Sequence, residues 1–193
     1  MKTTRRIFSM VLALMMVLSL SVTAFADTTT GTATISVYNQ GTKIKDLTVN
    51  AGTLVRDALN AAVADARVTE LTAISWTEVS GYPNTHTPHY ALDTINRIAA
   101  YAGTTEDLDG YEDFADVTED DAVEGYDGYY LVDQDNGYHY VYVGYSWVYY
   151  SQSGDTKTDI WVYMCDYAVS EGENVVVSFE KTVTDWTQDK PIG

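Results

Sequence analysis

The sequence predicts an α+β fold in which one or two helices cover one face of a mixed or antiparallel sheet. Segments with strand periodicity lie at both ends of the chain, a segment with helical periodicity follows the first two strands, and the last third is almost entirely strand-like. Strands and helices in this irregular order are typical of α+β domains. Beyond its first 26 residues the chain has a length that suits one domain, 27–193.

The first 26 residues have the three parts of a secretory signal. A basic start is followed by an apolar run and by the small-residue close Ala24-Phe25-Ala26, so we expect cleavage before Asp27. A membrane-spanning segment is the alternative, but it needs about 20 apolar residues. We therefore expect a secreted, extracellular protein, free or loosely associated with the cell wall, with no membrane partner after cleavage.

The charge excludes one class of partner. The chain has 28 acidic and 11 basic residues, and loss of the signal with Lys2, Arg5 and Arg6 leaves a net charge of −20. Such a polyanion repels phosphate backbones and anionic membrane surfaces. We expect no nucleic-acid partner, whereas solubility outside the cell and weak cation binding both stay open as roles for the charge.

The first half of the mature chain reads as a hairpin, a helix and a strand. Residues 32–38 and 43–49 have strand character and flank a turn, which predicts a hairpin. Helical periodicity from 54 to 66, with Thr53 as the N-cap, predicts a helix packed across that hairpin. Residues 71–79 return to strand character.

A second helix is expected in the middle of the chain. Pro88 suits a first helical turn, and Leu92, Ile95 and Ile98 are spaced as one helical face that ends at Gly103.

An acidic insertion at about 103–128 follows this segment. Half of the residues from 106 to 127 are Asp or Glu, so the segment repels itself and predicts a surface insertion with little regular structure. Residues 107–113 and 133–137 lack the glycine and glutamate positions of a calcium-binding hand, which leaves weak, diffuse cation binding.

The last third predicts four strands. The Asn136-Gly137 pair favours a tight hairpin that joins residues 131–132 to 138–150. Further strands are expected at 158–164 and 174–180.

Three segments resemble a known family. They are Val49-Asn50-Ala51-Gly52-Thr53-Leu54-Val55-Arg56-Asp57-Ala58-Leu59, the strand Ser146-Trp147-Val148-Tyr149-Tyr150, and the ending from Asp166 to Val177. In this order they resemble the transcobalamin-like C-terminal domain family of secreted and surface proteins in Gram-positive bacteria. The resemblance implies a β-grasp-like sheet and a non-catalytic role. Animal relatives of the family cap bound cobalamin, which makes a corrinoid or tetrapyrrole the suggested ligand, although no cofactor is certain.

His86 and His89 are candidate binding residues in a loop with two prolines. A zinc site needs about four ligands, and with one cysteine, Cys165, the sequence has no short Cys/His framework, so no metal site is predicted. Surface histidines are one interpretation, and a single axial imidazole to a cobalt or haem iron is the other. Cys165 is expected to be buried and structural rather than a nucleophile.

The most unusual feature is the aromatic strand 138–150. Period two places Tyr145, Trp147 and Tyr149 on one face and Tyr138, Tyr140, Tyr142 and Tyr150 on the other. One face should be core and the other partly exposed, where rigid rings suit a flat ligand, a sugar or a partner. We take Trp147, Tyr145 and Tyr149 as the candidate ligand surface, although tyrosine ladders that only stabilise the sheet remain an alternative.

These patterns favour a binding module over an enzyme. No nucleophile elbow, phosphate loop or dinucleotide-binding glycine pattern is present, so we expect no catalytic activity. The first hypothesis is a secreted module for a corrinoid, a tetrapyrrole or a surface ligand. The alternative is a structural or adhesive interaction domain of an extracellular bacterial assembly.

Overall fold

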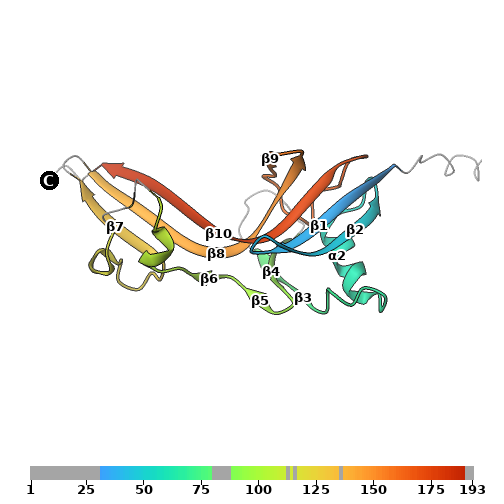
Figure 1. The fold of residues 1–193 in the computed structure, drawn as a ribbon, viewed down its shortest axis with the longest axis horizontal. Helices are drawn as coiled ribbons and strands as arrows, with labels where there is room; N and C mark the ends of the chain where they lie inside the picture. Colours follow the sequence, from blue (N-terminus) through green and yellow to red (C-terminus); the bar gives the residue numbers. More distant parts are fainter. Residues whose placement is uncertain (1–30, 80–87, 112–113, 115–116, 135–136, 190–193) are drawn as a thin grey trace, which may run out of the picture. The chain divides into compact units, whose positions relative to one another are not determined.

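The fold is α+β and consists mainly of sheet. The computed structural model describes residues 31–79, 88–111, 114, 117–134 and 137–189 (Figure 1). Two sheets, one α-helix and two 3-10 turns make up this part of the chain. Their bounds are β1 (Thr32–Asn39), β2 (Thr42–Asn50), α2 (Val55–Ala64), β3 (Ile74–Val79), β4 (His89–Ile95), β5 (Ile98–Ala99), β6 (Tyr101–Ala102), η1 (Thr105–Leu108), η3 (Glu119–Asp121), β7 (Tyr129–Gln134), β8 (Gly137–Ser153), β9 (Thr156–Asp159) and β10 (Asn174–Asp189).

The main sheet is mixed and has seven strands. Its order is β2-β1-β10-β8-β6, and β7 and β9 also pair with β8. The first and last strands, β1 and β10, lie side by side and parallel, while the other pairs are antiparallel. Parallel neighbours need a long connection, which here is the whole intervening chain.

Strand β8 has 17 residues, among which are six tyrosines and Trp147. One of its edges pairs with β10 along almost its whole length. The other edge pairs first with β7, then with β6 and finally with β9. The predicted hairpin of β7 and β8 is therefore confirmed, although residues 135–136 of its turn lie outside the described part.

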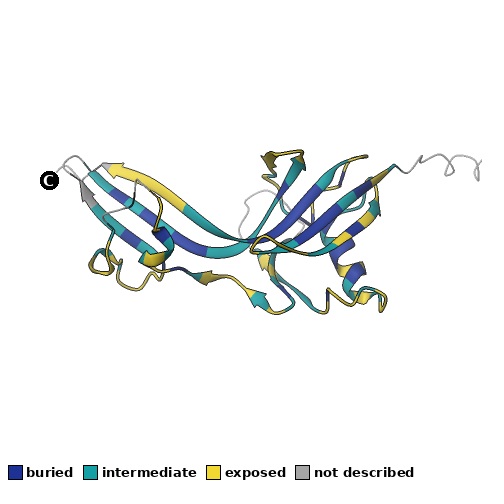
Figure 2. Ribbon diagram, viewed as in Figure 1, coloured by how far each residue is buried: buried dark blue, intermediate teal, exposed yellow. Residues whose placement is uncertain are grey.

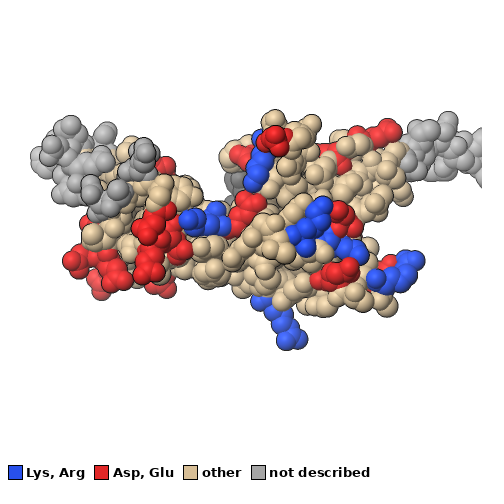
Figure 3. Space-filling model, viewed as in Figure 1, with Lys and Arg blue, Asp and Glu red and all other residues tan. Residues whose placement is uncertain are grey.

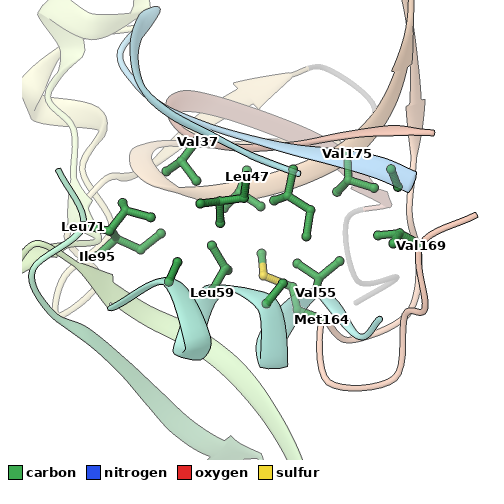
Figure 4. Packing of buried hydrophobic residues seen from close by; sticks show 14 residues of the cluster. Val37, Leu47, Val55, Leu59, Leu71, Ile95, Met164, Val169 and Val175 are labelled. Carbon is green, nitrogen blue, oxygen red and sulfur yellow. The ribbon is translucent and has the colours of Figure 1, made fainter. Parts of the chain in front are cut away.

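The predicted first hairpin and helix are confirmed by β1, β2 and α2. Gln40 and Gly41 connect the two strands with positive φ angles, as a tight hairpin turn requires. Figure 4 shows Val55 and Leu59 of α2 on the side of the helix that faces Val37 of the sheet. The N-cap prediction was wrong: Leu54 occupies that position and no side chain caps the helix. The N–H groups of Val55 and Arg56 instead bond to the carbonyls of Tyr167 and Met164.

The predicted second helix after Pro88 is wrong. Its residues form β4, β5 and β6, and β3, β4 and β5 make a separate antiparallel sheet. Asn96 and Arg97 both have positive φ angles and form a tight turn between β4 and β5, which a helix could not contain. Leu92, Ile95 and Ile98 satisfy a helical spacing, but the turn and the pairing with β3 override it.

The core of the described residues has two clusters. The larger cluster joins α2 to β1, β10 and neighbouring segments, and the smaller one consists of Leu108, Phe114, Tyr130, Val141 and Val143 (Figure 2). Leu108 and Phe114 come from the acidic segment expected as an insertion. That segment contains the two 3-10 turns, and it supplies apolar side chains to this second cluster as well as carrying charge.

Acidic side chains gather over β7 and the adjoining loops in Figure 3. The two 3-10 turns each begin with a capping box, in which Thr104 pairs with Asp107 and Thr118 with Asp121. Carboxylates at these positions accept backbone N–H groups that would otherwise lack partners. Two of the acidic side chains in this segment, Asp107 and Asp121, therefore stabilise its 3-10 turns.

The predicted secretory signal, residues 1–26, and its cleavage point before Asp27 lie outside the described residues. Within the described ranges, no helix combines the length and apolar character needed to cross a membrane.

Candidate functional site

An aromatic hollow lies where β8 meets the chain that follows β9. Its volume is about 330 Å³, at the lower end of the range for small-molecule sites. Three segments contribute to it: β4, β8 and residues 160–164, which follow β9. The lining residues are Tyr90, Ala91, Leu92, Trp147, Tyr149, Ile160, Trp161, Val162, Tyr163 and Met164.

Trp147 forms the inner wall of this hollow. Its ring packs against the larger core cluster and lies 5.3 Å from the ring of Phe179 between centroids. The indole Nε1–H donates to the carbonyl oxygen of Ile98 at 2.9 Å. The predicted site residue is therefore both a core anchor and part of the lining.

Tyr149 brings an unsatisfied polar group to the lining. Its hydroxyl oxygen is buried and has no hydrogen-bond partner among the described residues. Burial raises the pKa of Tyr149, and the nearby Asp166 adds to this effect, so the hydroxyl stays neutral. A buried hydroxyl without a partner lowers the stability of the fold.

Trp161 is 90 % exposed and lies at the same hollow. The strand predicted for residues 158–164 was wrong from Ile160 onward, because β9 ends at Asp159. The chain then leaves the sheet edge and turns at Tyr163, whose carbonyl accepts the N–H groups of Asp166 and Tyr167. This departure places Ile160, Trp161 and Tyr163 at the hollow.

His89 lies beside the hollow and is held from two sides. Its Nδ1 lies 2.6 Å from Oδ2 of Asp166, and its ring stacks on Tyr163 with 5.1 Å between centroids. Cys165 is buried next to Asp166, and its Sγ accepts the backbone N–H of Tyr90 at 3.4 Å. Ligand atoms of His89, Cys165 and Asp166 all lie within 4.8 Å of one another.

Of the other two predicted site residues, the structure separates Tyr145 from this group. Tyr145 is absent from the lining: it donates to Oδ1 of Asp107 at 2.7 Å and stacks on Tyr101. The hydrogen bond to Asp107 raises the pKa of Tyr145 to about 12. His86 lies outside the described residues.

A second aromatic group, on the opposite face of β8, was not selected from the sequence. We define the outer aromatic face as Tyr129, Tyr138, Tyr140, Tyr142 and Trp186. Tyr140 stacks on Trp186 with 5.4 Å between ring centroids and an interplanar angle of 7°. The ring centroids of Tyr129 and Tyr142 lie 4.5 Å apart. Trp186 is 42 % exposed. The signal was present in the sequence, since the valines at 141 and 143 mark the other face as the buried one.

Comparison of the chain with models of known protein families gave no match, and comparison with curated proteins gave none either.

Proposed function

We propose that this chain is a secreted, non-catalytic binding module that holds a flat ring of its ligand in the aromatic hollow. The observation that carries the proposal is Trp161, an indole that is 90 % exposed at the edge of a hollow lined by other aromatic rings. A large apolar side chain left in water gains most when a ligand covers it.

The hollow favours a particular class of ligand. Its volume suits one or two rings rather than a whole macrocycle. The acidic surface disfavours an anion. We infer a flat, neutral or cationic ring, either free or as the exposed part of a larger molecule.

The resemblance to transcobalamin-like domains adds a specific ligand to test. The parallel pair of β1 and β10, with α2 packed on the same sheet, supports a β-grasp-like core. In that interpretation a corrinoid or tetrapyrrole would enter the hollow by one edge, and His89 beside it would supply an axial imidazole.

The experiment is a titration of the purified chain with cyanocobalamin, haem and single-ring heterocycles, followed by tryptophan fluorescence. Trp161→Ala should weaken the binding of whichever probe enters the hollow by about 2 kcal/mol, or roughly 30-fold. Trp186→Ala is the matched control, because it also removes an exposed indole but lies on the opposite face of the main sheet. Equal affinities in wild type and Trp161→Ala would refute the proposal.

The outer aromatic face supports a second candidate, an adhesive domain of an extracellular assembly. The near-parallel pair of Tyr140 and Trp186 offers a flat apolar platform on which sugar rings can stack. If a neutral polysaccharide retains the wild type and Trp161→Ala but releases Trp186→Ala, this second function replaces the first.

A further inference from the structure

Three different metal-binding side chains converge at one edge of the aromatic hollow. His89 begins β4, whereas Cys165 and Asp166 lie in the turn after β9, and 77 residues separate His89 from Asp166. One ligand atom from each lies within 4.8 Å of the other two. This convergence is not the self-repelling acidic cluster of a solvated surface, because only one of the three groups is a carboxylate.

Neighbouring groups fix the positions of these side chains. The backbone N–H of Tyr90 donates to Sγ of Cys165 at 3.4 Å, a contact that a metal-bound sulfur can retain. The ring of Tyr163 stacks on His89 and sets the plane of the imidazole. Fixed ligands lose little conformational freedom when an ion binds.

We propose that His89, Cys165 and Asp166 form a binding site for a divalent transition-metal ion of the zinc class. Thiolate, imidazole and carboxylate together are the donor set that zinc takes, while calcium and magnesium prefer oxygen alone. The proposal goes beyond the proposed function, because it concerns a separate ligand and depends neither on Trp161 nor on a tetrapyrrole. His89 would bind this ion instead of an iron or cobalt in the hollow.

Only small movements would be needed to close the site on an ion. Ligand atoms around a tetrahedral zinc with bonds of about 2.0–2.3 Å lie about 3.3–3.8 Å apart. The contact of 2.6 Å between His89 Nδ1 and Asp166 Oδ2 would open by about 1 Å as the ion replaced the proton shared there. Side-chain rotation is sufficient for that change, and the thiol of Cys165 would release its proton to solvent.

The site has an entry path and an open coordination position. The Asp166 side chain is 43 % exposed, whereas that of His89 is 15 % exposed and Cys165 is buried, so an ion can reach the site from the side of Asp166. Three protein ligands leave a fourth position for water or for another molecule. Tyr90, Tyr163 and Met164, which are chain neighbours of the three ligands, line the hollow, so the metal site borders it.

The test is titration of the full chain with Co²⁺, which occupies zinc sites and reports sulfur ligation by a charge-transfer band in the near ultraviolet. We expect one equivalent to bind with such a band. Cys165 is the only cysteine in the chain, so absence of the band in the wild type overturns the proposal without any variant.

Variants then assign the other ligands. Cys165→Ser should abolish the band, and His89→Gln and Asp166→Asn should each weaken Co²⁺ binding at least tenfold. His139→Gln is the matched control, because His139 also pairs with a carboxylate, Asp185, at 3.1 Å, but forms no such cluster with the cysteine.

Unchanged affinity in both His89→Gln and Asp166→Asn, or a loss in His139→Gln instead, would also overturn the assignment. Thermal melting of each variant separates lost ligation from lost folding. Trp161→Ala should bind Co²⁺ like the wild type, so failure of the ligand hypothesis and failure of the metal hypothesis give different results.

Discussion

Replacement of Trp147 by alanine should destabilise the fold strongly even before any ligand is considered. The side chain packs on the larger core cluster, lies 5.3 Å from Phe179 and donates to the carbonyl of Ile98. Truncation would remove the ring contacts, leave a space against the cluster and deprive that carbonyl of its donor. The structural role and the lining role of Trp147 therefore cannot be separated by this variant alone.

The magnitude follows from the partial burial of Trp147. A fully buried tryptophan replaced by alanine costs about 3–5 kcal/mol. Trp147 is half-buried, which places the expected loss at about 3 kcal/mol, the lower end of that range. For a domain of this size, 1 kcal/mol shifts the melting temperature by about 2–4 °C, so the expected decrease is about 6–12 °C.

The assay is thermal and urea unfolding of Trp147→Ala, Trp147→Phe and Trp161→Ala beside the wild type. Trp147→Phe keeps a ring but loses the indole N–H, and should cost about 1–2 kcal/mol. Trp161→Ala should stay within about 0.5 kcal/mol, because that side chain is 90 % exposed. If Trp147→Ala melts within 2 °C of the wild type, Trp147 is not a core anchor and the reasoning from its contacts is wrong.

Three further predictions concern positions outside Trp147. Gly128→Ala should lower the free energy of unfolding in urea by about 2–4 kcal/mol, because φ is +78° and a Cβ would lie 2.5 Å from the carbonyl oxygen of Val143. Gly125→Ala has the same φ but open space around the added Cβ, and should lose only about 1 kcal/mol. Equal losses in the two variants would exclude the clash. Tyr149→Phe should unfold at the same or a higher urea concentration than the wild type, because the removed hydroxyl is buried without a partner. A decrease in unfolding free energy above about 1 kcal/mol would mean that this hydroxyl forms a hydrogen bond that the structure does not show. Hydrogen bonds from the backbone of Thr104 and from Tyr145 lower the pKa of Asp107, so its stabilising contribution is present above the unfolded-state pKa of about 3.9 and is lost as the pH falls through the folded value. The difference in unfolding free energy between wild type and Asp107→Asn should be constant from about pH 8 to pH 5 and shrink below about pH 4. A difference that does not change with pH would contradict the assignment.

Local periodicity predicted the fold well at both ends of the chain. β1, β2 and α2 follow short-range signals, namely alternation, a turn with positive φ angles and a helical stripe. The middle was different, because the apolar residues from Leu92 to Ile98 fit a helical face as well as strands. Pairing with β3 decided in favour of strands, and one sequence contains no information about that partner.

The candidate site was only partly predictable for the same reason. Trp147 and Tyr149 could be selected as aromatic residues of a family-like strand, and His89 as an imidazole in a loop with two prolines. The structure brings all three to one region. The proximity of Cys165 and Asp166 to His89 depends on a tertiary contact between the start of β4 and the turn after β9. Spacing rules for metal sites detect ligands that are close in sequence, so they could not detect this group.

The face of β8 that carries Val141, Val143 and Trp147 is covered by different segments along its length, and this explains where the hollow lies. Val141 and Val143 on that face are fully buried by the second cluster, and Trp147 farther along packs on the larger one. Beyond Trp147 the cover is a loop: β9 ends at Asp159, and residues 160–164 turn away from the sheet edge. If β9 were longer, it would cover the aromatic rings on this face of β8. Because it ends at Asp159, these rings surround the hollow, and Trp161 is exposed at its edge. The exposed apolar area therefore follows from the early end of β9, and a ligand that fills the hollow would cover it.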